Sequence, residues 1–90
     1  MAINYGQLRS LTARELIAAL IRDGFIFDRQ SGSHQHYRHA DGRRVTVSFY
    51  RPGETFTPKT LKRMIEDQAR WTEGDLRRLN LLKRVTGRGV

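Results

Sequence analysis

The sequence predicts a small α+β domain in which helices cover one face of a three-stranded antiparallel sheet. After Gly24 the apolar residues change from a helical period to the alternation of strands, and the helical period returns near Thr57. Thr12, Thr57 and Thr72 each stand where a helix cap is expected. The predicted order of elements is therefore α-β-β-β-α-α, within one domain over residues 1–90.

The first helix is expected over residues 13–23, after an extended or frayed lead-in of residues 1–11. Thr12 is a suitable N-cap, and Glu15 three residues later completes a capping box. The apolar face of this helix comprises Ala13, Leu16, Ile17, Leu20 and Ile21. Gly24 then supplies the left-handed residue that commonly ends a helix.

Three short strands are expected to follow as an antiparallel meander. The first covers residues 25–30, a Ser-Gly-Ser turn occupies 31–33, and the second strand covers 34–39. Asp41-Gly42 is a strong hairpin signal, and apolar residues alternate with polar ones over 45–50.

The length of the second hairpin loop leaves two registers open. A two-residue turn would place His34 opposite Phe49, whereas a three-residue loop would place it opposite Ser48. In either register His34, His36 and Arg38 lie on the same face, because side chains alternate along a strand.

Two further helices complete the chain, capped by Thr57 and Thr72. Their apolar faces comprise Leu61, Met64, Ile65 and Ala69 in the second helix, and Leu76, Leu79 and Leu82 or Val85 in the third. The third helix is expected to end at Gly87. The folded core is therefore expected over residues 12–85, and residues 86–90 are expected to fray.

The composition favours an anionic partner. The formal charge is +8, with 17 lysines and arginines against 9 aspartates and glutamates. Lysine occurs only at Lys59, Lys62 and Lys83, so the other basic residues are arginines, whose planar fork matches phosphate. This balance points to nucleic acid or to an acidic protein.

Other classes of protein are disfavoured by what the sequence lacks. There is no cysteine, which excludes disulfides and cysteine-based zinc sites. No apolar run is long enough for a signal peptide or a membrane span, so we expect a cytoplasmic protein without a membrane partner.

The three histidines, His34, His36 and His39, lie in one short segment with arginines around it. On a strand His34 and His36 could chelate a metal, but His39 would point to the other face, and the motif holds no carboxylate. We therefore expect no metal and no other cofactor. A Ser-His-Asp hydrolase is disfavoured too, because Ser33 and His34 are adjacent and their side chains would point apart.

Cleavage of RNA fits this segment better. A histidine beside arginines can remove the proton of a 2′-hydroxyl while the cations neutralise the charge that develops on phosphorus. This chemistry needs no metal, and it selects RNA because only RNA carries the internal nucleophile.

Two runs, GFIFDRQSGSHQHYRHADGRRVTVSF at residues 24–49 and PGETFTPKTLKRMI at 52–65, resemble the HicA family of bacterial toxins. The resemblance covers residues 12–82. It implies a fold like a double-stranded-RNA-binding domain with an added C-terminal helix. It also implies the toxin of a type II toxin–antitoxin system, an mRNA interferase that cuts transcripts and halts translation. The implied partners are mRNA and a HicB-type antitoxin that covers the active site.

The catalytic histidine of the family maps onto His34, and Gly32 and Ser33 map onto the turn that presents it. The side chains expected to bind RNA are Arg29, Ser33, His36, Arg38, Arg43, Arg44, Lys59 and Lys62. The two lysines lie in the first turn of the second helix, where positive charge opposes the helix dipole unless an anion docks there. The alternative for them is an incidental position on the surface.

The sequence departs from the family where the third strand ends. Many members have a proline followed shortly by a histidine there, and this chain has Ser48 and Tyr50. The second group that transfers a proton is therefore open among His36, Tyr37, Tyr50 and water. Two functions from other classes also remain: a non-catalytic RNA-binding module, and an adaptor that docks an acidic protein.

Overall fold

The structure is a computed structural model that describes residues 3–82. Its elements are η1 (Tyr5–Leu8), α1 (Ala13–Arg22), β1 (Ile26–Ser31), β2 (His34–Arg38), β3 (Arg44–Ser48), α2 (Pro58–Lys62), η2 (Arg63–Gln68) and α3 (Glu73–Arg78). The strands form one antiparallel sheet in the order β1-β2-β3. The α+β class and the three-stranded antiparallel sheet are thus confirmed, in an arrangement like that of a double-stranded-RNA-binding domain. None of the helices in the described part is long and apolar enough to cross a membrane.

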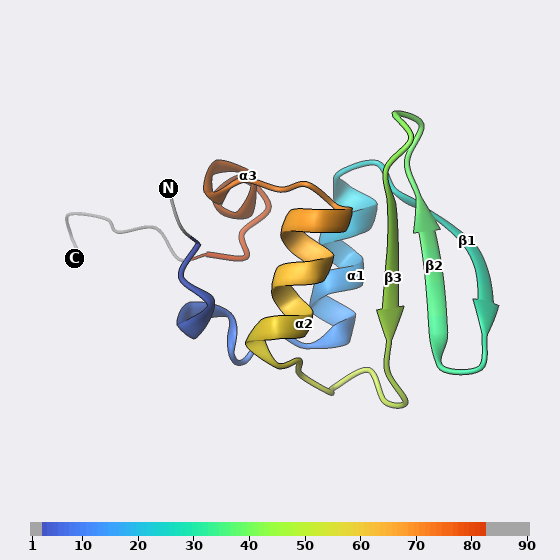
Figure 1. The fold of residues 1–90 in the computed structure, drawn as a ribbon, viewed down its shortest axis with the longest axis horizontal. Helices are drawn as coiled ribbons and strands as arrows, with labels where there is room; N and C mark the ends of the chain where they lie inside the picture. Colours follow the sequence, from blue (N-terminus) through green and yellow to red (C-terminus); the bar gives the residue numbers. More distant parts are fainter. Residues whose placement is uncertain (1–2, 83–90) are drawn as a thin grey trace.

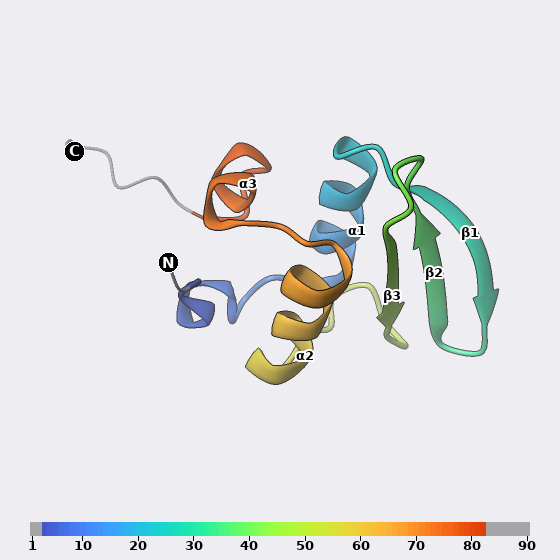
Figure 2. The ribbon, with the colours of Figure 1, turned by 45° about the horizontal axis from the view of Figure 1, so that its top comes forward.

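The helices gather on one side of the sheet. In Figures 1 and 2, β3 lies nearest to them and β1 farthest away, while η1 and α3 lie beyond α1 and α2. Tyr37, Val45 and Val47 point into the helical layer and are buried, so this inner face of the sheet closes the core.

The core contains the apolar residues that helical spacing predicts. All members of the second and third stripes within the described residues are buried, namely Leu61, Met64, Ile65, Ala69, Leu76, Leu79 and Leu82. In the first helix Ile21 differs, since it is 56% exposed. At about 100° per residue, Ile21 lies roughly a third of a turn from the centre of the stripe around Leu16 and Leu20, which explains its exposure.

Each main helix begins at its predicted threonine. The Thr12 hydroxyl accepts a hydrogen bond from the Glu15 N–H (3.2 Å), and the Glu15 carboxylate accepts one from the Thr12 N–H (2.9 Å). Thr72 and Asp75 form a second capping box, and Thr57 caps α2 with Pro58 at the first helical position. These starts are confirmed.

The expectation of an extended or frayed lead-in is wrong for the described residues. Tyr5 to Leu8 form the 3₁₀ turn η1, and Leu8 and Leu11 are buried. The Tyr5 hydroxyl also donates a hydrogen bond to the Glu66 carboxylate. A single 3₁₀ turn is too short to show a period, which is why the sequence pattern misses it.

The later helices end at residues with positive φ close behind them. The second helix widens from α2 into the π-helix η2 and ends at Gln68, and Arg70, two residues later, has φ +58°. The third ends at Arg78, because Asn80 adopts φ +63° and the Leu81 N–H turns back to the Leu76 carbonyl (2.8 Å). The expected stop at Gly87 and the expected frayed tail lie outside the described residues.

The second hairpin has the three-residue loop. Its register pairs His34 with Ser48, and the His39 N–H donates to the Arg43 carbonyl (2.9 Å) across the loop. Gly42 has φ +98°, as the last residue of such a loop requires. The first hairpin turns through Gly32 and Ser33 alone, and a bulge at Asp28 interrupts β1.

The two edges of the sheet differ in what covers them. The edge of β3 is closed by η2, whose Gln68 side chain accepts a hydrogen bond from the Thr46 N–H (3.0 Å). Just before β3, the Arg43 guanidinium donates to the Ala69 carbonyl (2.7 Å). Among the described residues no strand pairs with the outer edge of β1, whose six residues are all exposed.

Candidate functional site

The outer face of the sheet carries the polar residues that the sequence singled out. Cα pairing arranges them in three rows across β1, β2 and β3. The rows are Ser31, His34 and Ser48, then Arg29, His36 and Thr46, then Ile26, Arg38 and Arg44. We call these nine residues the outer face. The expected common face of His34, His36 and Arg38 is confirmed.

His34 is the first residue of β2 and follows directly on the Gly32–Ser33 turn. Its side chain is exposed, and its partners in the row are both serines. The hydroxyl oxygens of Ser33 and Ser48 lie 3.3 Å apart beside it. These small neighbours leave the imidazole open to solvent.

His36 is held more firmly than His34. Its Nδ1 lies 3.0 Å from the Thr46 hydroxyl oxygen, and the site is partly buried. The Thr46 backbone is fixed in turn by Gln68 at the end of η2. Thr46 is a site residue that sequence reasoning missed. Only the three-residue register brings it opposite His36, and the sequence left that register open.

Arginines supply the positive charge of the outer face. Arg29 and Arg44 are exposed. The Arg38 Nε lies 3.5 Å from a carboxylate oxygen of Asp28, with half of the Arg38 side chain exposed. An exposed ion pair of this kind is weak, so a phosphate can compete for the guanidinium.

Arg43 is turned away from the outer face. Its guanidinium donates hydrogen bonds to Asp41 (2.8 Å), to Asp23 (3.2 Å) and to the Ala69 carbonyl (2.7 Å), and it lies 4.9 Å over the Phe25 ring. The alternation of β3 sends its neighbour Arg44 outward instead. The structure therefore gives Arg43 a structural position, which differs from the expected contact with RNA.

His39 is likewise structural. Its Nε2 lies 2.8 Å from the Asp23 carbonyl oxygen, and its ring meets the edge of Phe25 at a centroid distance of 5.0 Å. It does not join the other two histidines. Within residues 3–82, no three His, Cys, Asp or Glu side chains gather closely enough to hold a metal ion.

The Asp23 carboxylate joins several elements behind the sheet. It accepts hydrogen bonds from the Trp71 indole (2.8 Å), from Arg78 (2.9 Å) and from Arg43 (3.2 Å). Burial raises the pKa of Asp23, but these three donors outweigh it and hold the pKa below its ordinary value of 3.8. The carboxylate is thus kept charged and ties the hairpin to the helices.

Lys59 and Lys62 are not on the outer face. They lie on α2, which packs against η1, whereas η2, the continuation of this helix, packs against β3. In Figures 1 and 2, the start of α2 and the turn before His34 lie at the same lower end of the molecule, separated by the loop that leaves β3.

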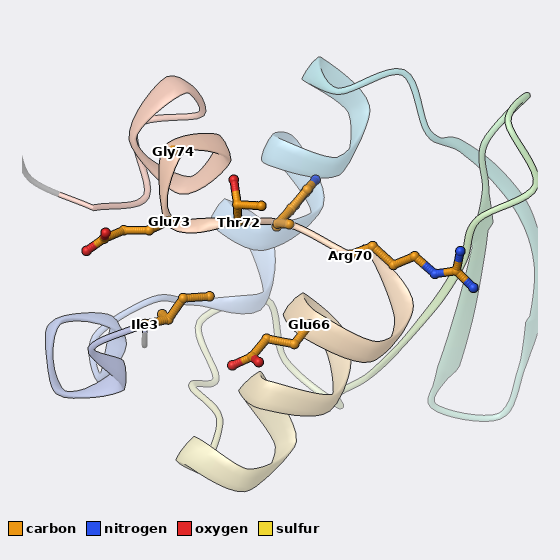
Figure 3. Close-up of a pocket in the computed structure, with 7 residues that line it drawn as sticks. Ile3, Glu66, Arg70, Thr72, Glu73 and Gly74 are labelled. Carbon is orange, nitrogen blue, oxygen red and sulfur yellow. The ribbon is translucent and has the colours of Figure 1, made fainter. Parts of the chain in front are cut away.

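An open pocket of about 550 Å³ lies elsewhere, between Ile3, the end of η2 and the start of α3. Ile3, Glu66, Arg70 and Thr72 are among its lining residues (Figure 3). None of its lining residues belongs to a strand or is a histidine, so the pocket is separate from His34 and His36.

Comparison with known proteins identifies the family of the chain. No curated protein matches the chain. The family model described as the HicA toxin of bacterial toxin–antitoxin systems matches residues 13–70, which is more than half of the chain. The match runs from α1 to the end of the second helix and includes every residue of the outer face. The chain therefore belongs to the HicA toxin family of bacterial toxin–antitoxin systems.

Proposed function

We propose that this toxin is a metal-independent endoribonuclease that cuts mRNA and so halts translation and growth. The observation that carries the proposal is the position of His34, exposed on a sheet face that also presents Arg29, Arg38 and Arg44. An accessible imidazole among guanidinium groups is what the cleavage of RNA by its own 2′-hydroxyl requires.

In this mechanism His34 accepts or gives a proton at the reacting phosphate, and the arginines stabilise the negative charge of the transition state. Arginine suits that role because its donors are fixed in one plane and match phosphate oxygens in pairs. Since the nucleophile is the 2′-hydroxyl, DNA of the same sequence is not a substrate.

The geometry of the outer face supports a set of proposed contacts with RNA. Ser33, His36 and the three arginines of the outer face bind the nucleotides around the cut. Arg43 is left out, because its donors are occupied within the protein. Lys59 and Lys62, at the start of α2, bind RNA that continues past the end of the sheet where the turn between β1 and β2 lies.

The second partner in the proposal is an antitoxin. A toxin–antitoxin family implies such a partner in general. We propose one of the HicB type, which covers the outer face in the cytoplasm. An acidic surface on that antitoxin would complement the net charge of +8.

The test is a cleavage assay in EDTA with wild type and His34→Ala, given a long single-stranded transcript. We expect the wild type to cut the transcript and His34→Ala to lose at least 100-fold in rate (about the size of a general-acid or general-base effect), while circular dichroism shows both folded. Binding of RNA without cleavage by the wild type would instead identify a non-catalytic RNA-binding module. Equal cleavage by a folded His34→Ala would remove His34 from the mechanism.

A further inference from the structure

We infer that His36 is the second proton-transfer group of the reaction, the general acid that protonates the leaving 5′-oxygen, and that Thr46 positions it. This inference rests on the proposed ribonuclease function. It selects one group from the four that the sequence left open.

The two tyrosines, Tyr37 and Tyr50, are less well placed than His36 to give a proton to the leaving oxygen. Tyr37 is 5% exposed on the inner face, and its hydroxyl donates to Gln35 (2.7 Å), so it lies on the wrong side of the sheet. Burial also raises the pKa of Tyr37. Tyr50 lies past the end of β3 and is 86% exposed, with no strand to fix it.

The spacing of the two histidines suits a single phosphate. Residues two apart on a strand lie about 6.6 Å apart and point the same way. His34 and His36 can therefore approach the attacking and the leaving oxygen of one phosphoryl group from two sides, each through a hydrogen bond of about 2.8 Å.

Thr46 is placed to stabilise the protonated imidazole of His36, which is the form that a general acid needs. A protonated imidazole is a donor at both nitrogens. The Thr46 hydroxyl oxygen, 3.0 Å from Nδ1, accepts one of these hydrogen bonds and fixes the plane of the ring. Nε2 is then left to donate to the substrate. His34 has no such partner among the described residues, which fits the role of a base that must be free to accept a proton.

The charged groups that face His36 come from all three strands. They are Arg29 on β1, which is its partner in the row, His34 and Arg38 on β2, and Arg44 on β3. Asp28, at the bulge, is engaged with Arg38. Arg29 is thus placed to hold the phosphate oxygens while protons move on either side.

The step balances as follows. His34 takes the proton of the 2′-hydroxyl, and the 2′-oxygen forms a bond to phosphorus. The bond from phosphorus to the 5′-oxygen breaks, and that oxygen takes the proton from Nε2 of His36. The products are a 2′,3′-cyclic phosphate and a 5′-hydroxyl, with His34 protonated and His36 neutral.

The first experiment uses an RNA oligonucleotide that spans a site cut by the wild-type protein. Under single turnover in EDTA, we expect His36→Ala to lose about 10²–10⁴-fold in rate. Its affinity for the same RNA with a 2′-deoxy nucleotide at the cut should fall by no more than about tenfold, the effect of one lost hydrogen bond, and so by far less than its rate. The pH–rate profile should lose the limb that reports the acid. Tyr50→Phe is the matched control and should keep the wild-type rate.

The second experiment separates an acid from a base. In an RNA with sulfur in place of the leaving 5′-oxygen, the thiolate departs without a proton, since thiols are far more acidic than alcohols. His36→Ala should recover most of its rate on this RNA, and His34→Ala should not. Thr46→Val should lose roughly tenfold on normal RNA through misplacement of the ring, and Thr46→Ser, which keeps the hydroxyl, should not.

Three results would overturn the inference. They are a wild-type rate for His36→Ala, a loss of affinity as large as the loss of rate, and a recovery by His34→Ala in place of His36→Ala on the sulfur substrate. If the wild type cuts no RNA, the proposed function fails and this inference fails with it. If the wild type cuts and only His34→Ala is inactive, the ribonuclease stands and His36 is excluded.

Discussion

At the scale of single residues, Gly24 shows how closely the end of α1 meets the β2–β3 hairpin. Its φ is +100°, and a Cβ built there would lie 2.8 Å from Nε2 of His39. That nitrogen is already bonded to the Asp23 carbonyl, so it cannot move without losing its partner. The sequence predicted a glycine stop here, and the structure adds the reason why a side chain is excluded.

We expect Gly24→Ala to lower the free energy of unfolding by about 2 kcal/mol, because the backbone is strained for an L-residue and the methyl group meets His39. Urea denaturation followed by circular dichroism measures this loss. Gly53→Ala is the matched control: its Cβ would enter open space, so a change within about 0.5 kcal/mol is expected. Equal losses of unfolding free energy in the two variants would show that neither the positive φ of Gly24 nor its contact with His39 destabilises the alanine variant.

At the scale of elements, the helix starts depend on threonine caps and the helix ends on left-handed residues. The starts at Thr12, Thr57 and Thr72 could be predicted, because a cap and its partner three residues later are local in sequence. The ends at Arg70 and Asn80 could not, since arginine seldom adopts positive φ and asparagine is only a weak stop signal.

The capping box of α1 makes a prediction at this scale. Thr12→Ala should lower the free energy of unfolding by about 1 kcal/mol, because the Glu15 N–H loses its acceptor. Thr12→Ser keeps the oxygen and should cost a few tenths of a kcal/mol at most. Thermal and urea denaturation measure both. A loss by Thr12→Ser as large as that of Thr12→Ala would mean that the threonine methyl group, and not the cap, stabilises the helix.

At the scale of the whole molecule, Asp23 connects α1, the β2–β3 hairpin, the segment after η2 and α3. Its pKa is lower in the folded chain than in the unfolded one. At acidic pH the Asp23 carboxylate therefore binds fewer protons in the folded state than in the unfolded state. The stability that Asp23 contributes is therefore fully present above about pH 4–5 and is lost as the pH falls through 4 toward the lower folded value.

We expect the free energy of unfolding of the wild type to fall between pH 5 and pH 2.5, and Asp23→Asn to show a shallower fall. At pH 7, Asp23→Asn should lose about 2 kcal/mol, because hydrogen bonds to a charged acceptor become weaker. Urea titrations at a series of pH values test both statements. If the free energy of unfolding of Asp23→Asn falls with pH as steeply as that of the wild type, the acid sensitivity belongs to other carboxyl groups whose pKa is lowered, such as Asp41 and Asp75.

The sequence predicts only the part of the candidate site that follows from the alternation of side chains along a strand. Strand periodicity was sufficient to place His34, His36 and Arg38 together. It could not separate Arg43 from Arg44, since loop length and the packing of Phe25 decide which guanidinium turns inward. Thr46 was missed because the sequence leaves the register of the second hairpin open, and the contact of Thr46 with Gln68 joins residues 22 apart, which no local pattern reports.

The unequal edges of the sheet limit how copies of this chain can associate. A sheet grows when a strand adds to a free edge, and endless growth needs two free edges on every copy. Within residues 3–82, η2 closes the edge of β3, so growth can start only from β1. Two copies that joined through β1 would leave no free edge behind, and strand addition would stop at a pair instead of continuing into a fibre.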